Sequence, residues 1–442
     1  MKENSKSLAS MKFCIRTFGC QMNENDSERI AGILAAAGAK MTGSPEDSDL
    51  IIINTCAVRE KSEEKLYSYL GRLAPLKKSK KLVVGVVGCV AQLYRSEIME
   101  RTPFVDFIIG PDNYTQFADI IRSSQEEKVV SASWSKDFHE FPSDMTLRES
   151  DVSAYVTIME GCDNFCAYCI VPFTRGREKF RAKKNILREV QSLAENGYLE
   201  VQLLGQNVNS YTDPESGKGF AFLLREVNRI RGIEWVRFLT SHPKNFSQQI
   251  GEAMKESDKV CRQLHLPVQA GSSSVLKRMN RGYTREEYLK KIDMLRQLMP
   301  DISLSTDIIV GFPGETEKEF QDTLSLLAEA RFTNIFSFRY SPRPLTAASH
   351  KKDSIPIDEK KRRLTEVQEL QKKIQVEFNS SLIGRTMKVL CLGKSKKDPA
   401  VFAGRNQGYQ VVNFRSKKDV RGQFVEVRIT SCGPYSLIGE AV

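Results

Sequence analysis

The chain has 442 residues, of which 40% are hydrophobic and 27% are charged, and its formal net charge is +11. Its length predicts about three domains, and its composition is typical of a soluble globular protein. The first residues lack the apolar core of a secretory signal, and no apolar run is long enough to cross a membrane. We therefore expect a cytoplasmic protein in which the ten cysteines serve metal or redox chemistry rather than disulfides.

Residues 11–125 alternate between apolar runs and helical patterns. The runs "DLIIINTC" and "KLVVGVVGC" are nearly continuous, as in strands that a parallel sheet buries on both faces. Between the first strands, Ile30, Ile33 and Leu34 lie at helical spacing and Gly38 ends the pattern. The region predicts a small doubly wound α/β domain, followed by a polar linker over residues 126–150.

Six further strand-like runs, separated by helical segments, occupy the next part of the chain. Two of the helices begin at capping boxes, Thr284 with Glu287 and Thr316 with Glu319. Six consecutive βα units predict a partial or complete parallel barrel, within a central domain over residues 151–380. The chemistry of such a barrel is expected at the C-terminal ends of its strands.

Residues 381–442 change to short alternating strands between glycine-bearing turns, which predicts a small β-barrel. This segment holds eleven lysines and arginines but only four acidic residues, so it carries +7 of the net charge of +11. Such a concentration favours a nucleic-acid partner over an evenly solvated lysine surface. Arg405, Lys417 and Lys418 are the candidate contacts in this domain.

Three cysteines, Cys162, Cys166 and Cys169, lie within eight residues in the spacing C-x3-C-x2-C. Thiolates select zinc, copper or iron–sulfur clusters, and a closed tetrahedral site needs a fourth ligand. His242 or His265 could complete a zinc site by folding back. The other interpretation is a four-iron cluster held by three cysteines, whose fourth iron is open to another ligand.

A second set of three cysteines, Cys20, Cys56 and Cys89, lies at the ends of three predicted N-terminal strands. Parallel strands end on one edge of a sheet, so these thiols are expected to converge. The alternative is that each is a small buried core residue. The remaining cysteines show no such pattern and are expected to pack in cores: Cys14, Cys261, Cys391 and Cys432.

A basic run follows the C-x3-C-x2-C motif directly. A solvated helix face is the usual explanation of such a run. Its place beside the predicted cluster favours contacts to the phosphates of an RNA loop instead. The candidate residues are Arg175, Arg177, Arg181, Lys183 and Lys184.

The segment "GCDNFCAYC" at the start of a six-unit barrel resembles the radical S-adenosylmethionine (SAM) signature. Together with "FGCQMNENDSE", "INTCAVREK", "GCVAQ" and "MNRGYTREEY", it makes the chain similar to the methylthiotransferase family over nearly its whole length. Within that family these segments are most similar to the MiaB branch. The resemblance implies an α/β cluster domain, a radical SAM partial (β/α)6 barrel and a C-terminal barrel of the TRAM type.

The same resemblance implies two [4Fe-4S] clusters, one on each cysteine set, with SAM on the open iron of the barrel cluster. Sulfur insertion and methylation would occur at C2 of N6-isopentenyladenosine, next to the anticodon of a tRNA. The implied partners are the anticodon stem-loop, an electron donor of flavodoxin or ferredoxin type and a source of sulfur, and the chain is expected to be a monomer. The expected SAM contacts are Tyr168, Gly205, Gln206, Asn207, Gln269 and Asp307.

Several alternatives remain open at this point. Tyr168 could be an ordinary core residue, and "GFPGET" could be a turn before the Thr316 capping box rather than a SAM contact. The substrate could instead be threonylcarbamoyl-adenosine in tRNA or a ribosomal protein, as in other branches of the family. A non-catalytic iron–sulfur protein that binds RNA or transfers electrons would also explain the cysteines and the charge.

Overall fold

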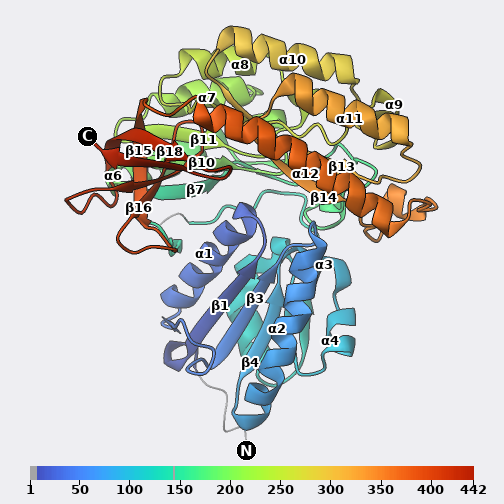
Figure 1. Cartoon of the computed structure of the whole chain (residues 1–442). Coiled ribbons are helices and arrows are strands. Elements are labelled where there is room, and N and C mark those ends of the chain that lie inside the picture. The colour runs from blue at the N-terminus through green and yellow to red at the C-terminus, as the bar shows by residue number, and fades with distance from the viewer. Residues whose placement is uncertain (1–6, 143–144) are drawn as a thin grey trace, which may run out of the picture.

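The computed structural model describes residues 7–142 and 145–442, which form three units (Figure 1). They are a parallel α/β sheet domain, an open barrel of βα units and a small closed β-barrel. This arrangement confirms the predicted multidomain α/β architecture. No helix of the described residues is long and apolar enough to cross a membrane.

The N-terminal unit is a parallel sheet with the strand order β2-β1-β3-β4-β5-β6. Its strands are β1 (Lys12–Phe18), β2 (Lys40–Met41), β3 (Leu50–Thr55), β4 (Val83–Val87), β5 (Phe107–Ile109) and β6 (Val129–Ser131). Every residue of β3 and β4 is buried, because helices cover both faces. The last strand, β6, lies in the segment that was predicted to be a linker, so the sheet continues past residue 125.

Two layers of helices give this sheet its two cores. Ile51 and Ile53 point toward α2, α3 and α4, whereas Ile52 points toward α1 and α5. The helices are α1 (Gln21–Ala36), α2 (Glu60–Ser79), α3 (Cys89–Tyr94), α4 (Glu97–Arg101) and α5 (Phe117–Ser124). The doubly wound arrangement leaves the C-terminal ends of the strands free of helices, and chemistry in such sheets is found there.

The central unit contains six βα units. Its strands are β7 (Ser153–Thr157), β10 (Glu200–Leu204), β11 (Trp235–Phe238), β12 (Gln263–His265), β13 (Ser303–Val310) and β14 (Asn334–Arg339). They form two parallel three-stranded sheets, and an isolated bridge pairs Val236 of β11 with Val260, just before β12. The barrel is therefore partial, and no ladder joins β14 to β7.

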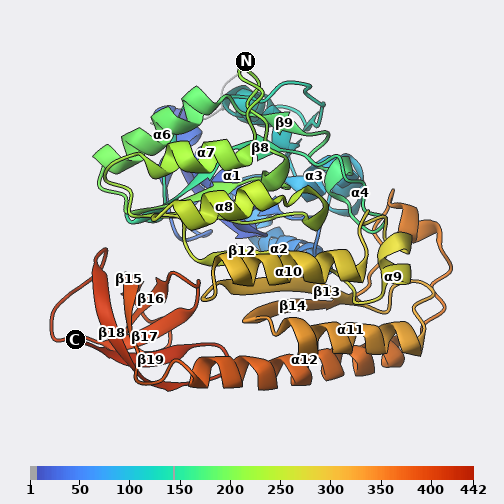
Figure 2. The same cartoon turned by 90° about the horizontal axis from the view of Figure 1, so that it is seen from above.

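Helices cover the outside of this barrel (Figure 2). They are α6 (Lys183–Glu195), α7 (Phe220–Asn228), α8 (Gln248–Glu256), α9 (Ser273–Arg278), α10 (Arg285–Leu298), α11 (Glu317–Ala330) and α12 (Ile357–Ser380). Both predicted capping boxes are present, at the starts of α10 and α11. A short antiparallel pair, β8 (Met159–Glu160) and β9 (Lys179–Phe180), flanks the loop that carries the C-x3-C-x2-C motif.

The C-terminal unit is a closed barrel with the strand order β15-β16-β17-β19-β18. Its strands are β15 (Thr386–Lys394), β16 (Phe402–Asn406), β17 (Val411–Arg415), β18 (Phe424–Cys432) and β19 (Leu437–Ala441). It packs against the central unit where Trp235, at the start of β11, meets the ring of Phe424. The C-terminal unit thus lies at the N-terminal ends of the strands of the central unit. The N-terminal unit contacts the C-terminal ends of these strands, where its Asn25 accepts a hydrogen bond from the hydroxyl of Thr157 at the end of β7.

Candidate functional site

The three N-terminal cysteines each follow a strand of the parallel sheet. Cys20 caps α1 just after β1, Cys56 directly follows β3, and Cys89 begins α3 just after β4. The three strands are neighbours, so their ends share one edge. As expected from that order, the thiols of Cys20 and Cys56 are hydrogen bonded and the charge of Cys89 acts on Cys56.

The surroundings of this set favour the ionisation of one thiol. The hydrogen bond from Cys56 lowers the pKa of Cys20 to about 6, and the backbone at Asn23 and the charge of Arg175 act in the same direction. The same hydrogen bond raises the pKa of Cys56, and burial raises it further. A metal is bound by the thiolate form, so Cys20 is prepared as a ligand.

Two asparagines that the sequence did not single out hold the first two cysteine loops together. The Nδ2 of Asn23 donates to Oδ1 of Asn54 at 3.0 Å, and the Nδ2 of Asn54 donates to the carbonyl of Asn23 at 2.9 Å. Gly88, with φ 92°, packs against the same asparagine, since a Cβ there would lie 2.4 Å from Oδ1 of Asn54. The only signal in the sequence was that each asparagine stands within three residues of a cysteine.

The second set lies in the loop between β8 and β9, at the C-terminal side of β7. The backbone N–H of Cys169 donates to the carbonyl of Cys166 at 2.9 Å, and that of Cys162 donates to the carbonyl of Gly176 at 3.1 Å. Burial raises the pKa of Cys169 to about 12, and the neighbouring Cys166 and Cys162 add to the effect. Three mutually repelling thiols in one buried loop need a cation or a metal to ionise together.

Arg281, which no pattern in the sequence singled out, is a cation beside this set. Its Nη1 donates to the Sγ of Cys166 at 3.2 Å and to the hydroxyl of Tyr168 at 3.3 Å. Its side chain is buried, and its Nη2 donates to the carbonyl of Pro267. Arg281 thus links Cys166 and Tyr168 of the cysteine loop to the backbone just after β12. The segment "MNRGYTREEY" was the only signal for it.

His242 does fold back toward the cysteines, as the zinc interpretation required, but in the wrong tautomer. Its Nδ1 accepts a hydrogen bond from the backbone of Lys244, so the proton is on Nε2, which lies 3.6 Å from the Sγ of Cys166. A protonated nitrogen donates and cannot bind a metal. His265 instead contacts Ser305 and Asp307 on β13.

No three Cys, His, Asp or Glu side chains in the described part of the chain converge closely enough to hold a single metal ion. The described residues therefore offer no preformed site for a single zinc ion at either cysteine set.

The predicted SAM contacts divide into two groups. Gln206 accepts a hydrogen bond from the backbone of Gly161, the residue before Cys162, and Asn207 bonds to Glu178 at 3.2 Å in the same loop. Gly205 precedes them, and a Cβ there would lie 2.5 Å from the side chain of Met159. These three residues lie against the cysteine loop, and their role as SAM contacts remains a prediction.

Gln269 and Asp307 make their contacts elsewhere in the barrel. Gln269, with φ 77°, pairs through its backbone with Asp307 and Ile309 of β13. The carboxylate of Asp307 lies 3.4 Å from Nε2 of His265. Neither side chain has a hydrogen bond to the cysteine loop among the described contacts. Their prediction as SAM contacts remains a prediction.

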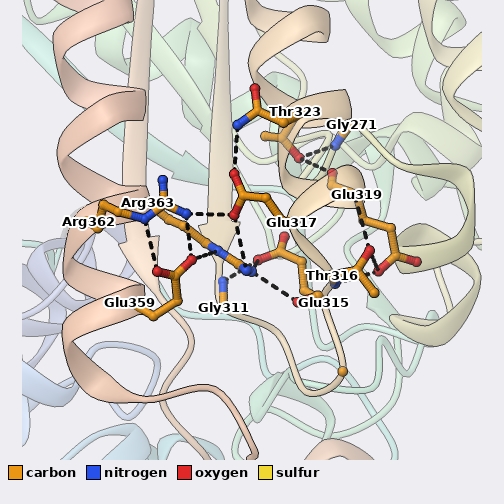
Figure 3. A network of polar contacts seen from close by, with 12 residues as sticks. Gly271, Gly311, Glu315, Thr316, Glu317, Glu319, Thr323, Glu359, Arg362 and Arg363 are labelled. Carbon is orange, nitrogen blue, oxygen red and sulfur yellow. Dashed lines mark hydrogen bonds and ion pairs between the residues drawn. The ribbon is translucent and has the colours of Figure 1, made fainter.

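The "GFPGET" segment is a turn that α12 locks in place (Figure 3). The buried carboxylate of Glu315 accepts from the backbone of Gly311 at 2.7 Å and from Nη1 of Arg363 at 2.9 Å. Thr316 then begins α11 through its capping box with Glu319. These contacts account for the segment as a structural turn.

The basic run after the cysteine loop does not form one surface, and the prediction for two of its members is corrected. Arg175 is buried in an ion pair with Asp26, and Arg181 is buried in an ion pair with Glu189. Their guanidinium groups are therefore occupied inside the protein and cannot reach RNA phosphates. The pattern of alternating basic residues does not reveal this burial, because the acidic partners lie on the helices α1 and α6.

The other predicted RNA contacts are accessible. The side chain of Arg177 is 71% exposed and lies over the ring of Phe165, between two of the cysteines, while Lys184 is exposed beside Glu215. Lys183 lies over the ring of Phe222 and is half-buried. In the C-terminal barrel, Lys417 and Lys418 are exposed, and Arg405 stacks on Tyr409 at 3.9 Å.

A cavity of about 670 Å³ opens between the N-terminal unit and the cysteine loop. Its wall combines aromatic and basic side chains, and Trp134 is 47% exposed there. Arg95 and Lys136 come from the N-terminal unit, while Phe173 and Arg177 come from the cysteine loop. A wall of this kind can stack a nucleobase and pair with phosphate.

Three family models match successive parts of the chain. Residues 12–110 match the uncharacterized protein family UPF0004, residues 156–327 match the radical SAM superfamily, and residues 380–442 match the TRAM domain. In solved structures, the radical SAM methyltransferase TsrM from Kitasatospora setae is similar with a TM-score of 0.57. That likeness has 13% identity and covers 76% of this chain and 74% of TsrM. The cobalamin-dependent radical enzyme OxsB has a TM-score of 0.53 at 12% identity, over 83% of this chain and 56% of OxsB.

At these identities the structural likeness shows the fold alone. The match of residues 156–327 to the radical SAM superfamily, together with the open barrel and its three-cysteine loop, defines the class: the chain is a radical SAM protein with an additional domain at each end. A tRNA-2-methylthio-N(6)-dimethylallyladenosine synthase from Acetivibrio thermocellus is 45% identical, over 97% of this chain and 91% of that protein. The synthase of the same name from Geobacter metallireducens is 46% identical over 96% and 97%. The chain therefore belongs to the family of tRNA-2-methylthio-N(6)-dimethylallyladenosine synthases.

Proposed function

We propose that this chain is a tRNA methylthiotransferase, a radical SAM enzyme that places a methylthio group on C2 of N6-isopentenyladenosine next to the anticodon. The product is 2-methylthio-N6-isopentenyladenosine. One observation carries the proposal beyond the family name: a residue just after the barrel set reaches across the domain boundary to the N-terminal set. Arg175, in the segment that follows the barrel set, donates from Nε to the Sγ of Cys89 in the N-terminal set at 3.3 Å.

Each cysteine set would hold a [4Fe-4S] cluster with one iron that has no protein ligand: Cys20, Cys56 and Cys89 for the first, Cys162, Cys166 and Cys169 for the second. The buried hydroxyl of Thr55, the residue before Cys56, has no hydrogen-bond partner among the described residues. A hydroxyl is a donor, and the sulfur atoms of a bound cluster would be acceptors for it.

When bound, the clusters and SAM supply the radical that removes hydrogen from an aromatic carbon and the sulfur and methyl group that replace it. The residues of this chain prepare the two sites electrostatically. Arg175 and Arg281 each place a buried cation against a cysteine, which offsets the negative charge of the thiolates. His242 adds a neutral N–H donor to Cys166.

SAM would lie against the cysteine loop at the C-terminal ends of the barrel strands. Tyr168 would contact its adenine, and the backbone around Gly205, Gln206 and Asn207 would hold its polar groups, since these residues already contact the loop. Asp307 and Gln269 would act from β13 and the end of β12. The fixed loop would keep water away from the reacting carbon.

The RNA would approach from the side of the exposed basic residues. Arg177, Lys183 and Lys184 would contact the phosphates of the anticodon stem-loop near the cysteines, and Arg405, Lys417 and Lys418 would contact it from the C-terminal barrel. The cavity beside Trp134 is large enough for an unstacked base. Bases in such loops are exposed at little cost, so the target adenosine can leave the loop and reach the barrel.

The chemistry also requires partners from outside this chain. An electron donor of flavodoxin or ferredoxin type would reduce the barrel cluster, and a separate source would renew the sulfur. We place the enzyme in the cytoplasm, where its substrate is found, and expect it to act as a monomer.

The decisive experiment compares tRNA nucleosides from cells with and without this gene. Deletion should remove 2-methylthio-N6-isopentenyladenosine, and the intact gene, but not a Cys166→Ala variant, should restore it. Loss of methylthiolated threonylcarbamoyl-adenosine, or of a modified ribosomal protein, would instead assign the chain to another branch. If the reconstituted protein made no 5′-deoxyadenosine from SAM and reductant, the chain would be a non-catalytic iron–sulfur protein.

A further inference from the structure

Leu345 has a strained backbone and an exposed side chain. Its φ is 67°, in the left-handed region that favours glycine, and the residue is 59% exposed. Neither feature stabilises the fold, because a left-handed leucine costs free energy and its exposed side chain gains little from packing. Strain of this kind clusters at active sites and ligand-binding sites. Leu345 therefore indicates a contact with a partner of the protein.

The loop that carries Leu345 follows β14 and is anchored beside both cysteine sets. On one side of Leu345, Nη2 of the buried Arg343 donates to the carbonyl of Val58 at 3.3 Å, two residues after a cysteine of the N-terminal set. On the other side, the backbone N–H of Ala348 donates to the carbonyl of Ala167 at 2.7 Å, inside the cysteine loop of the barrel. Leu345 lies between these two anchors, so the fold fixes its position relative to both sets.

Leu345 also lines the cavity of about 670 Å³ beside the cysteine loop. Three further apolar residues share this wall, each from a different part of the chain. They are Leu93 of α3, Trp134 after β6 and Phe173 after the barrel cysteines. The cavity thus has apolar wall residues in addition to the basic ones, and apolar surface in a cavity favours an apolar part of a ligand.

We propose that Leu345 contacts the N6-isopentenyl group of the target adenosine and selects RNA that carries it. The inference rests on the proposed function, and it assigns a specificity-determining residue to that function. Carbons C2 and C6 of adenine are both bonded to N1, so a group on N6 stays close to the carbon that reacts. That carbon has to be reached from both cysteine sets, and Leu345 is an exposed aliphatic residue on the loop anchored beside both.

The chemistry of the isopentenyl group matches a leucine side chain. The group is a branched hydrocarbon, and its burial against another hydrocarbon is favourable in proportion to the apolar area removed from water. A threonylcarbamoyl group on N6 carries a carboxylate and amides instead. Contact with Leu345 would remove water from those polar atoms without replacing their hydrogen bonds. The same side chain therefore favours the isopentenyl group and disfavours a polar one.

The test measures the affinity of the reconstituted full chain for anticodon stem-loops that differ only at the target adenosine. One loop is isopentenylated, one carries threonylcarbamoyl and one is unmodified. Fluorescence anisotropy in the absence of reductant gives each dissociation constant without turnover. The parent protein should bind the isopentenylated loop about ten-fold more tightly than the unmodified loop, roughly the effect of burying two methylene groups.

Variants of Leu345 separate the apolar side chain from the backbone conformation. Leu345→Asn has a similar size and suits the left-handed region but is polar, and Leu345→Gly removes the side chain. Both should bring the ratio of the two dissociation constants close to one, whereas the apolar Leu345→Met should keep most of the preference. The thermal midpoint of Leu345→Gly should not fall, because glycine relieves the strain at φ 67°.

Arg331→Gly is the matched control for strain. Arg331 has φ 43° at the end of α11, so glycine relieves a left-handed residue there too, and the preference for the isopentenylated loop should not change. A loss of preference in this control would overturn the proposal. So would an unchanged ratio in Leu345→Asn and Leu345→Gly, or equal affinity of the parent protein for the isopentenylated and unmodified loops.

Equal weakening of all three stem-loops by Leu345→Asn would make Leu345 a general RNA contact and would also overturn the proposal. None of these results changes which nucleoside disappears when the gene is deleted. The failure of this inference is therefore distinguishable from a failure of the proposed function.

Discussion

The Nε2 of His242 lies 3.6 Å from the Sγ of Cys166, and its proton points at the sulfur because Nδ1 accepts from the backbone of Lys244. Burial lowers the pKa of His242 to about 2, and the charges of Arg281 and Lys244 act in the same direction. The ring is therefore neutral and a donor at any physiological pH. Its role is to hydrogen bond to a thiolate of the proposed barrel cluster.

This contact predicts the effect of His242→Phe on the reduction potential of that cluster. Hydrogen bonds to cluster sulfurs raise the potential, so their loss should lower it. The expected shift is about 40 mV, the one-electron equivalent of a hydrogen bond worth about 1 kcal/mol. A redox titration followed by electron paramagnetic resonance measures it. His242→Gln, which keeps an N–H, should recover part of the shift, and His265→Phe should leave the potential unchanged.

A second prediction concerns the independence of the two cysteine sets. In Cys166→Ala the barrel set loses a ligand, whereas Cys20, Cys56 and Cys89 lie on a separate sheet edge. The variant should form no 5′-deoxyadenosine from SAM and reductant but should keep the cluster of the N-terminal set, visible by Mössbauer spectroscopy. Loss of both clusters together would show that the sets depend on each other.

The different burial of Arg177 and Arg181, two neighbouring arginines of the basic run, leads to opposite predictions for them. Arg177→Ala should weaken the binding of an anticodon stem-loop and reduce the slope of log K against log salt by about 0.9, because one phosphate contact is lost. Arg181→Met should leave that slope unchanged but destabilise the fold by about 3 kcal/mol, since it leaves Glu189 partly unpaired inside the protein. Filter binding at several salt concentrations and urea unfolding separate the two. A reduced salt slope in Arg181→Met would reinstate it as an RNA contact.

The C-terminal barrel can be tested without removing it. Deletion would expose the face that covers Trp235 and break the hydrogen bonds from Arg237 to the carbonyls of Asn406 and Gln407, at 2.7 and 2.9 Å. The double variant Lys417→Ala and Lys418→Ala changes only exposed charge. It should weaken tRNA binding several-fold and reduce the salt slope by about 1.8. An unchanged slope would remove this loop from the RNA interface.

A pH prediction follows from Glu319 at the start of α11. The hydrogen bond from Arg278 lowers the pKa of Glu319 to about 2, from its usual 4.5. A depressed folded-state pKa means that the stabilisation is complete above about pH 4.5 and is lost as the pH falls toward 2. Glu319→Gln should therefore be less stable than the parent protein at neutral pH, and the difference in unfolding free energy should shrink on acidification. A difference that does not change with pH would contradict this.

Local sequence patterns were sufficient to predict the order of the main secondary-structure elements. The apolar runs, the two capping boxes and the positions of Cys20, Cys56 and Cys89 at strand ends are all short-range features, and parallel strands bring their ends to one edge. Two strands of the C-terminal barrel have a weak signal in the sequence for a local reason. β16 and β19 each carry a central glycine, Gly404 and Gly439, which weakens the strand pattern. A Cβ at either would lie within 2.5 Å of a backbone oxygen of the facing strand.

The sequence alone determined which residues could carry the chemistry: two sets of three cysteines, a parallel barrel and a basic C-terminal module. Only the tertiary structure decided which charges serve that chemistry. Arg175 and Arg181 belong to a run that is typical of a surface, yet ion pairs with Asp26, distant in sequence, and with Glu189, eight residues further along the chain, hold them inside. Spacing along the chain does not reveal whether a charged side chain is buried or exposed. Burying an ion is favourable only where the fold places a counter-ion beside it.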